Sequence, residues 1–227
     1  MPDIPPPRNT VLIFDLDGTL VDSAPDLAAA MNHVLGLEGF TPLPPEDVRH
    51  LVGHGARALL EAGLATHGAS ATDEKMDGLI ALFIEHYKAH LTDKSRPFPG
   101  VAETLASLQK EGFPLAVCTN KREELALPLL QDLDLSSYFD CIICRDSLPK
   151  YKPDPLPLRT CAERTGTRSG IMVGDTMTDL SAALAADMSC LIASVGYGCF
   201  EPEDIKKARQ FDRFDEIPGI ISEIISA

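Results

Sequence analysis

The sequence predicts an α/β protein, a doubly wound parallel sheet with a Rossmann-like core and an all-helical cap inserted after the first strand. Three observations lead to this prediction. Short apolar runs alternate with helix-patterned segments, which is the order expected of a parallel sheet covered on both faces. A long stretch with helical periodicity and no clear strand separates the first run from the second. Polar side chains directly follow the apolar runs, where open α/β sheets bind their ligands.

The first predicted strand begins at Thr10 and leads into Asp15. Its continuous apolar run, Val11–Phe14, is typical of a strand that is buried on both faces. Further runs of this form are Pro114–Cys118, Phe139–Cys144, Gly170–Val173 and Cys190–Ala193. A helical pattern precedes each of them, over residues 101–108, 125–133, 156–162 and 180–184.

Residues 22–96 are predicted to form the helical cap, and residues 1–21 with 97–227 the Rossmann-like core. Ser23–Asp26 has the sequence of a capping box with proline in the first turn of a helix. Apolar residues at helical spacing over residues 76–91 indicate the last helix of the insert. Because the insert leaves directly after the first strand, we expect it to act as a lid over the ligand-binding edge of the sheet.

The composition excludes several classes of partner. The chain has 20 Lys and Arg against 34 Asp and Glu, and its net charge of −14 argues against nucleic acid as a partner. No apolar stretch reaches the roughly 20 residues of a membrane helix, so we expect a soluble protein with no membrane partner. The six cysteines are scattered, and Cys141 and Cys144 have no second pair to complete a zinc site. We expect reduced thiols and a cytoplasmic location.

Carboxylates follow two of the predicted strands. Asp15 and Asp17 lie in the run DLDGT after the first strand, and Asp175 and Asp179 lie in GDTMTD after the fourth. Each pair alone has an ordinary structural explanation, a turn or a charge at a helix N-terminus. Together, four carboxylates at one sheet edge repel one another unless a cation lies between them, and Mg²⁺ is the hard cation that fits best. We therefore predict that Asp15, Asp17, Asp175 and Asp179 bind Mg²⁺.

Hydroxyl, amide and lysine side chains complete the predicted site. Thr119 and Asn120 end the second strand at the start of a helix, where backbone N–H groups can hold phosphate oxygens. Lys152 lies in the proline-stiffened segment YKPDP, although a solvated loop lysine is the simpler explanation. Thr19 adds a hydroxyl to the loop after the first strand. We expect Thr19 and Asn120 to bind a small phosphorylated metabolite.

In this order and on these strand ends, the motifs resemble those of the haloacid dehalogenase superfamily of phosphohydrolases and phosphotransferases, whose first motif is DxDGT. The resemblance covers nearly the whole chain. It implies that Asp15 is a nucleophile that becomes an aspartyl phosphate, and that Asp17 protonates the leaving oxygen and then activates water. It also implies that Thr119 binds the phosphoryl group, that Lys152 balances charge, and that Asp175 completes a Mg²⁺ site.

A finer resemblance is to the phosphoglycolate phosphatases. The matching segments are FDLDGTLVDS, PFPG, CTNK, VGYG and VGHGAR, at residues 14–23, 97–100, 118–121, 195–198 and 52–57. The resemblance implies hydrolysis of 2-phosphoglycolate, with Gly53, His54 and Arg57 of the cap facing the substrate. The alternative is that the glycines of this loop only break the chain between two cap helices.

Two other functions stay open. Asp17 argues against halide-removing enzymes, because a halide leaving group needs no proton. Phosphatases or mutases of small sugar phosphates can share Asp17 and a helical cap, and a non-catalytic regulator that binds a phosphorylated ligand could keep the same fold. The chain departs from the family at Asp187, where glycine is usual, and a left-handed helix cap there would cost local stability. The oligomeric state is not predicted.

Overall fold

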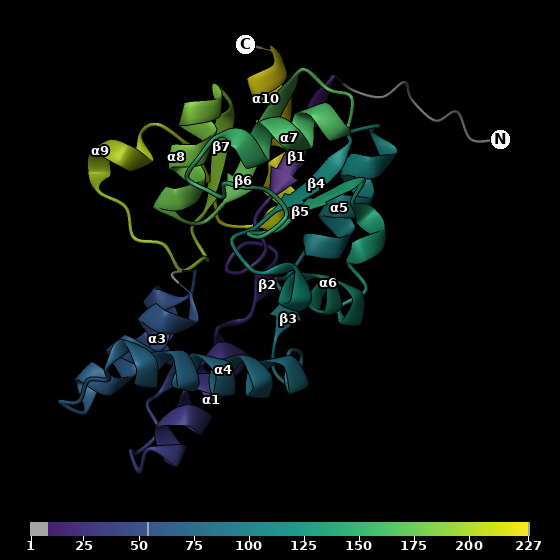
Figure 1. Ribbon diagram of the computed structural model, residues 1–227. Coiled ribbons are helices and arrows are strands. Elements are labelled where there is room, and N and C mark those ends of the chain that lie inside the picture. Colours follow the sequence, from purple (N-terminus) through teal and green to yellow (C-terminus); the bar gives the residue numbers. More distant parts are fainter. Residues whose placement is uncertain (1–8, 54, 227) are drawn as a thin grey trace. The chain divides into compact units, whose positions relative to one another are not determined.

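The computed structural model describes residues 9–53 and 55–226, which Figure 1 shows as a ribbon. These residues divide into two compact units. The first combines the residues up to Val21 with those from Pro97 onward, and the second is Asp22–Arg96. The two links between the units, β2 (Val21–Asp22) and β3 (Arg96–Pro97), pair with each other as a two-stranded sheet.

The first unit is built on a six-stranded sheet whose paired strands are all parallel. Its spatial order is β5 (Cys141–Ile143), β4 (Leu115–Cys118), β1 (Thr10–Phe14), β6 (Ser169–Gly174), β7 (Ser189–Ala193) and β8 (Arg209–Phe211). The chain passes outward from β1 through β4 to β5 and then adds β6, β7 and β8 on the other side of β1. The strand order therefore reverses at β1, and the predicted doubly wound α/β fold is confirmed.

Helices cover this sheet and bury its apolar side chains (Figure 1). They are α5 (Val101–Lys110), α6 (Glu123–Asp132), η2 (Ser136–Tyr138), α7 (Leu156–Arg164), α8 (Met177–Ala186), α9 (Pro202–Ile205), η3 (Phe214–Glu216) and α10 (Ile217–Ser226). Val11 and Ile13 of β1 pack in one cluster with residues of α7 and α8. Leu12 and Phe14 are equally buried, so β1 is covered on both faces as its apolar run predicts.

One strand differs from the sequence prediction, and one helix terminus agrees with it. The pattern does not predict β8, because Arg209 and Gln210 are exposed and only Phe211 is buried. At the C-terminus of α8, Asp187 ends the helix with φ 60° and ψ 39°. The expected left-handed cap is therefore present, and it is formed by a residue that tolerates this conformation less well than glycine.

The second unit is helical, with α1 (Ala24–Leu37), α2 (Pro45–Val48), η1 (Arg49–Leu51), α3 (Ala56–Thr66) and α4 (Asp73–Ala89). Helix α1 packs against α3 and α4. The buried side chains Met31, Leu60, Phe83 and Tyr87 form part of its interior. Within residues 9–53 and 55–226, none of the helices combines the length and apolar character needed to cross a membrane.

The predicted capping box at Ser23–Asp26 is wrong. No side-chain hydrogen bond caps α1 at Ser23. The buried Asp26 carboxylate instead accepts hydrogen bonds from the backbone N–H groups of Lys94 and Ser95 and from the Ser95 hydroxyl. These donors belong to the chain as it returns toward β3, and a buried N–H must find an acceptor. Asp26 therefore ties the first turn of α1 to the returning chain.

Candidate active site

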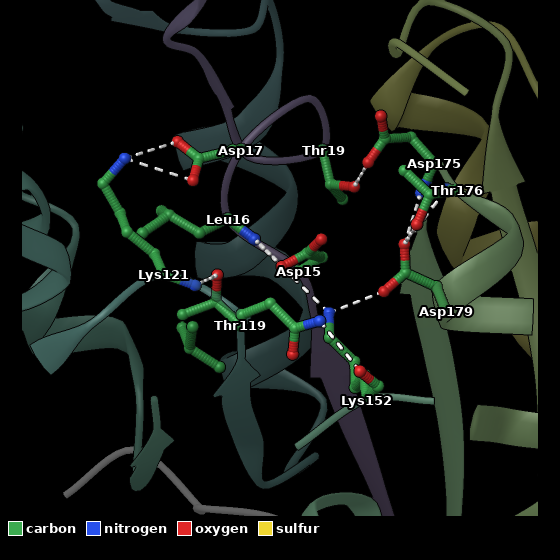
Figure 2. Close-up of polar contacts among 12 residues, drawn as sticks. Asp15, Leu16, Asp17, Thr19, Thr119, Lys121, Lys152, Asp175, Thr176 and Asp179 are labelled. Atoms are coloured by element: carbon green, nitrogen blue, oxygen red, sulfur yellow. Dashed lines mark hydrogen bonds and ion pairs between the residues drawn. The ribbon is translucent and has the colours of Figure 1, made fainter. Parts of the chain in front are cut away.

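The predicted site residues of the first unit gather at the carboxyl edge of the sheet, where the strand order reverses (Figure 2). Asp15 follows β1, Thr119 follows β4, and Asp175 follows β6. Because β4 and β6 are the two neighbours of β1, these three residues lie side by side. Eight predicted residues belong to this unit, and they are Asp15, Asp17, Thr19, Thr119, Asn120, Lys152, Asp175 and Asp179.

Lys152 joins two of the carboxylates. Its Nζ lies 3.0 Å from Asp15 Oδ1 and donates to Asp179 Oδ1 at 2.6 Å. The lysine is 1% exposed, so the solvated-loop explanation is wrong. Burial by itself lowers the pKa of Lys152. The charges of Asp15 and Asp179 raise it by more than burial lowers it, so the pKa lies above its usual value. Lys152 therefore remains a cation in the interior.

Asn120 supports the lysine segment and presents an unused acceptor. Its Nδ2 donates to the Lys152 carbonyl oxygen at 2.9 Å. Its Oδ1 is buried and accepts no hydrogen bond from the residues that the structure describes. A buried acceptor of this kind normally has a donor in a bound molecule or water. Asn120 thus fits a place at the wall of a binding site.

Neutral donors and glycines hold Asp175 in place. Thr19 Oγ1 donates to Asp175 Oδ1 at 2.9 Å, and the Tyr197 backbone N–H donates to Asp175 Oδ2 at 2.8 Å. A Cβ added at Gly18 would lie 2.2 Å from Asp175 Oδ2, and one added at Gly196 would lie 2.2 Å from Asp175 Cβ. Gly18 also has φ 83°, a conformation that favours glycine. Only glycine lets these two segments close on the carboxylate.

Asp179 is fixed by the start of α8. Its Oδ2 accepts hydrogen bonds from the Thr176 backbone N–H at 3.0 Å and from the Thr176 hydroxyl at 2.7 Å. Its Oδ1 is left for Lys152. The carboxylate therefore serves both as a helix-terminal acceptor and as part of the charged cluster.

Three of the carboxylates are placed to share a cation. Asp15, Asp175 and Asp179 are buried, and each offers one oxygen within 4.8 Å of the others. Burial and the neighbouring Asp179 charge together raise the pKa of Asp15 to about 7, although Lys152 opposes this shift, and they raise the pKa of Asp175 to about 8. A divalent cation opposes these shifts, because it stabilises the charged form of each carboxylate. The residues present therefore fit a hard divalent metal ion.

Asp17 lies outside this group of three, although the sequence analysis includes it among the metal ligands. Its carboxylate is paired with Lys121, whose Nζ donates to Asp17 Oδ1 at 2.9 Å. Lys121 is not among the site residues that the sequence predicts. The available signal is its position in the CTNK segment, two residues after Thr119.

The remaining predicted residues belong to the helical unit. Gly53 has φ 94° and lies between η1 and α3, a geometry that the chain-breaking explanation accounts for. Arg57 donates to Asp73 at 3.1 Å and to Asp77 at 2.9 Å, so its guanidinium already pairs with carboxylates of α4. His54 lies outside the described residues.

The fold and the site together define a class of protein: a doubly wound α/β protein with a buried cluster of aspartates and lysine at the reversal of strand order and a helical insert after the first strand. The sequence profile of the haloacid dehalogenase-like hydrolases matches residues 12–193. The chain belongs to this family.

Individual relatives are similar over most of their length. The chain is 38% identical to a phosphoglycolate phosphatase of Agrobacterium fabrum, covering 97% of this chain and 96% of the relative. It is 43% identical to a phosphoglycolate phosphatase of Caulobacter vibrioides, covering 84% and 81%. A crystal structure described as a predicted phosphoglycolate phosphatase from Haemophilus somnus superposes with a TM-score of 0.85 at 29% identity, covering 94% of this chain and 99% of the other.

Proposed function

We propose that the protein is a Mg²⁺-dependent phosphatase that hydrolyses 2-phosphoglycolate to glycolate and phosphate through an aspartyl phosphate on Asp15. The observation that carries the proposal is the buried junction at Lys152, 3.0 Å from Asp15 and 2.6 Å from Asp179, beside the carboxylate of Asp175. Membership of the hydrolase family and the similarity to phosphoglycolate phosphatases support phosphatase activity.

In the first step, an Asp15 oxygen attacks phosphorus while the bond to the leaving oxygen breaks and Asp17 gives that oxygen a proton. In the second, Asp17 takes a proton from water, the water oxygen attacks phosphorus, and the bond to Asp15 breaks. Thr119 is suited to bind the phosphoryl oxygens, because its Oγ1 accepts the Lys121 N–H and keeps its own hydrogen for donation. Lys152 supplies a fixed positive charge close to the nucleophile.

Asp15, Asp175 and Asp179 would hold the metal ion. A bound Mg²⁺ would neutralise charge on the phosphoryl oxygens and on the surrounding carboxylates. The carboxylate of Asp17 as a fourth ligand stays a prediction, since in this structure it is paired with Lys121.

We extend the proposal to substrate selection. A site that recognises phosphate and metal alone does not discriminate among esters, so selectivity has to come from further contacts. We assign these contacts to Thr19 and Asn120 in the first unit and to Gly53, His54 and Arg57 in the helical unit. Arg57→Ala is expected to lower the preference for 2-phosphoglycolate over an uncharged aryl phosphate. Equal losses on both esters would make Arg57 structural, in line with its bonds to Asp73 and Asp77.

The compartment is part of the proposal. All six cysteines are free thiols and five of them are buried. Free thiols are expected in a reducing compartment, which supports a cytoplasmic location.

A turnover panel with and without Mg²⁺ tests the function. It compares 2-phosphoglycolate with hexose phosphates, nucleotides and an aryl phosphate, and it uses Asp15→Asn as the inactive control. We expect the highest kcat/KM for 2-phosphoglycolate and loss of turnover in EDTA. A sugar phosphate or nucleotide as the better substrate would overturn the substrate while leaving a phosphatase. No turnover of any ester would favour the non-catalytic regulator.

A further inference from the structure

A buried ion pair lies at the edge of the active site. Lys121 donates through Nζ to both carboxylate oxygens of Asp17, at 2.9 and 3.1 Å. The side chains are 5% and 13% exposed, so the pair is largely removed from solvent. Figure 2 shows the two side chains facing each other, with Asp17 directed toward Lys121 and away from the junction of Lys152 with Asp15 and Asp179.

The pairing follows from the register of two neighbouring strands. Strands β1 and β4 are parallel, and Phe14 lies opposite Val117. Asp17 and Lys121 follow shortly after these two residues, so both reach the same edge of the sheet although they are 104 positions apart in sequence. A shift of one strand against the other would separate them.

The backbone holds both partners of the pair. The Lys121 N–H donates to Thr119 Oγ1 at 3.1 Å, and the Lys121 carbonyl accepts the Arg145 N–H at 3.1 Å. The loop that carries Asp17 is closed by the Gly18 N–H donating to the Val21 carbonyl at 2.9 Å. The ion pair therefore joins two side chains whose main chains are already fixed, so little additional order is lost when it forms.

Charge explains why Asp17 needs such a partner. Asp15 and Asp179 already share the buried cation Lys152, and Asp175 belongs to the same group of buried carboxylates. A fourth carboxylate directed into this group would be repelled unless it were compensated. Lysine is seldom buried without a counter-charge, so Lys121 and Asp17 stabilise each other where each alone would be costly.

We propose that Lys121 is a positioning residue for hydrolysis: it fixes the orientation of the Asp17 carboxylate and thereby sets the efficiency of proton transfer to the leaving oxygen and from water. The inference rests on the proposed function, because it requires Asp17 to be the acid and base. Lys121 acts through Asp17 and not on the phosphoryl group. Proton transfer depends steeply on the placement of the donor, so loss of this contact affects catalysis more than binding.

The test compares two phosphate esters in four variants. 2-Phosphoglycolate has an alkoxide leaving group that needs a proton, whereas 2,4-dinitrophenyl phosphate has one that leaves as an anion. The variants are Lys121→Gln, Lys121→Arg, Asp17→Asn and the double variant Asp17→Asn with Lys121→Gln. Lys206→Gln is the matched control, because Lys206 also pairs with a carboxylate, at 2.8 Å, but is 66% exposed on the surface. The value of kcat/KM reports the steps up to formation of the aspartyl phosphate.

We expect Lys121→Gln to lower kcat/KM for 2-phosphoglycolate by about 100-fold and for the dinitrophenyl ester by less than about threefold. KM for 2-phosphoglycolate should change far less than kcat. Lys121→Arg, which keeps the cation, should lose less than Lys121→Gln. The double variant should match Asp17→Asn within about twofold, since two residues that act as one unit are not additive.

Three outcomes would overturn the inference. Lys121→Gln could behave like Lys206→Gln, it could lose equally on both esters, or its loss could multiply with that of Asp17→Asn. The second and third would indicate direct contact with the phosphoryl group. Should Lys121→Gln fail to fold by circular dichroism, the comparison of Asp17→Asn with the double variant, in which both charges of the pair are removed, decides between the same results.

Failure of the proposed function is distinguishable from these outcomes. A wild-type protein that hydrolyses neither ester, or an Asp17→Asn variant with wild-type rates on 2-phosphoglycolate, would remove the acid-base role itself. Only the role of Lys121 would be ruled out if the wild-type protein turns over normally, Asp17→Asn loses activity and Lys121→Gln keeps it.

Discussion

Gly196→Ala is expected to damage the active site through one methyl group. The added Cβ would lie 2.2 Å from Asp175 Cβ and 2.6 Å from Asp175 Oδ2. Ordinary contacts begin at 3.4 Å, so the Asp175 side chain or the loop has to move by about 1 Å. Asp175 is also held by Thr19 and by the Tyr197 N–H, and a move of this size breaks one or both hydrogen bonds. A displacement of about 1 Å in a catalytic group can cost on the order of 100-fold in rate.

The assay is a Mg²⁺ titration of 2-phosphoglycolate hydrolysis. We expect Gly196→Ala to lower kcat/KM by roughly 100-fold and to raise the Mg²⁺ concentration needed for half-maximal rate. Gly219→Ala is the control, because Gly219 lies in α10 and an added Cβ there meets nothing within 4 Å. A Gly196→Ala enzyme with wild-type rates and wild-type Mg²⁺ dependence would refute the packing argument around Asp175.

Two further predictions concern stability. In EDTA, the melting temperature should fall as the pH rises from about 4 to about 8. Burial raises the pKa of Asp15 to about 7 and that of Asp175 to about 8, from a usual value of 3.8. Over this pH range the folded protein therefore binds more protons than the unfolded chain, and its stability decreases as the pH rises. Asp175→Asn should flatten this dependence, and an unchanged slope in that variant would contradict the assignment. The second prediction concerns the end of α8. Asp187→Gly should raise the free energy of unfolding in urea by roughly 0.5–1 kcal/mol, because glycine adopts φ 60° without a steric penalty. As a control, Asp132→Gly at the end of α6 should lower the free energy of unfolding. A destabilised Asp187→Gly would show that the aspartate side chain itself contributes there.

Local sequence patterns predict much of this fold because they reflect local physics. The central strands are buried on both faces, so each appears as a continuous apolar run. The edge strand β8 buries only Phe211 and has no such run. The capping rule fails at Ser23 for a related reason: Asp26 binds a segment 68 to 69 positions away, and a rule restricted to neighbours does not include those donors.

The candidate site likewise combines features that local sequence patterns predict with features that depend on distant residues. Alternation of strand and helix is enough to place Asp15, Thr119 and Asp175 at one edge of the sheet. The partner of Asp17 depends on the register of β1 against β4, which the chain does not display locally, so the pairing with Lys121 is found only in three dimensions. Gly196 appears in sequence as part of a VGYG segment, and its steric role emerges only from its distance to Asp175.

The proposed mechanism requires Asp15 to become phosphorylated during turnover. The most direct measurement is rapid acid quenching of the enzyme with 2-phosphoglycolate and Mg²⁺, followed by mass spectrometry of its peptides. We predict that the peptide containing Asp15 gains the mass of one phosphoryl group and that this signal is absent in Asp15→Asn. In Asp17→Asn with an activated aryl phosphate, the phosphorylated peptide should accumulate, because loss of the base slows hydrolysis of the intermediate. Full turnover by Asp15→Asn, or a phosphoryl group found on another residue, would show that Asp15 is not the nucleophile.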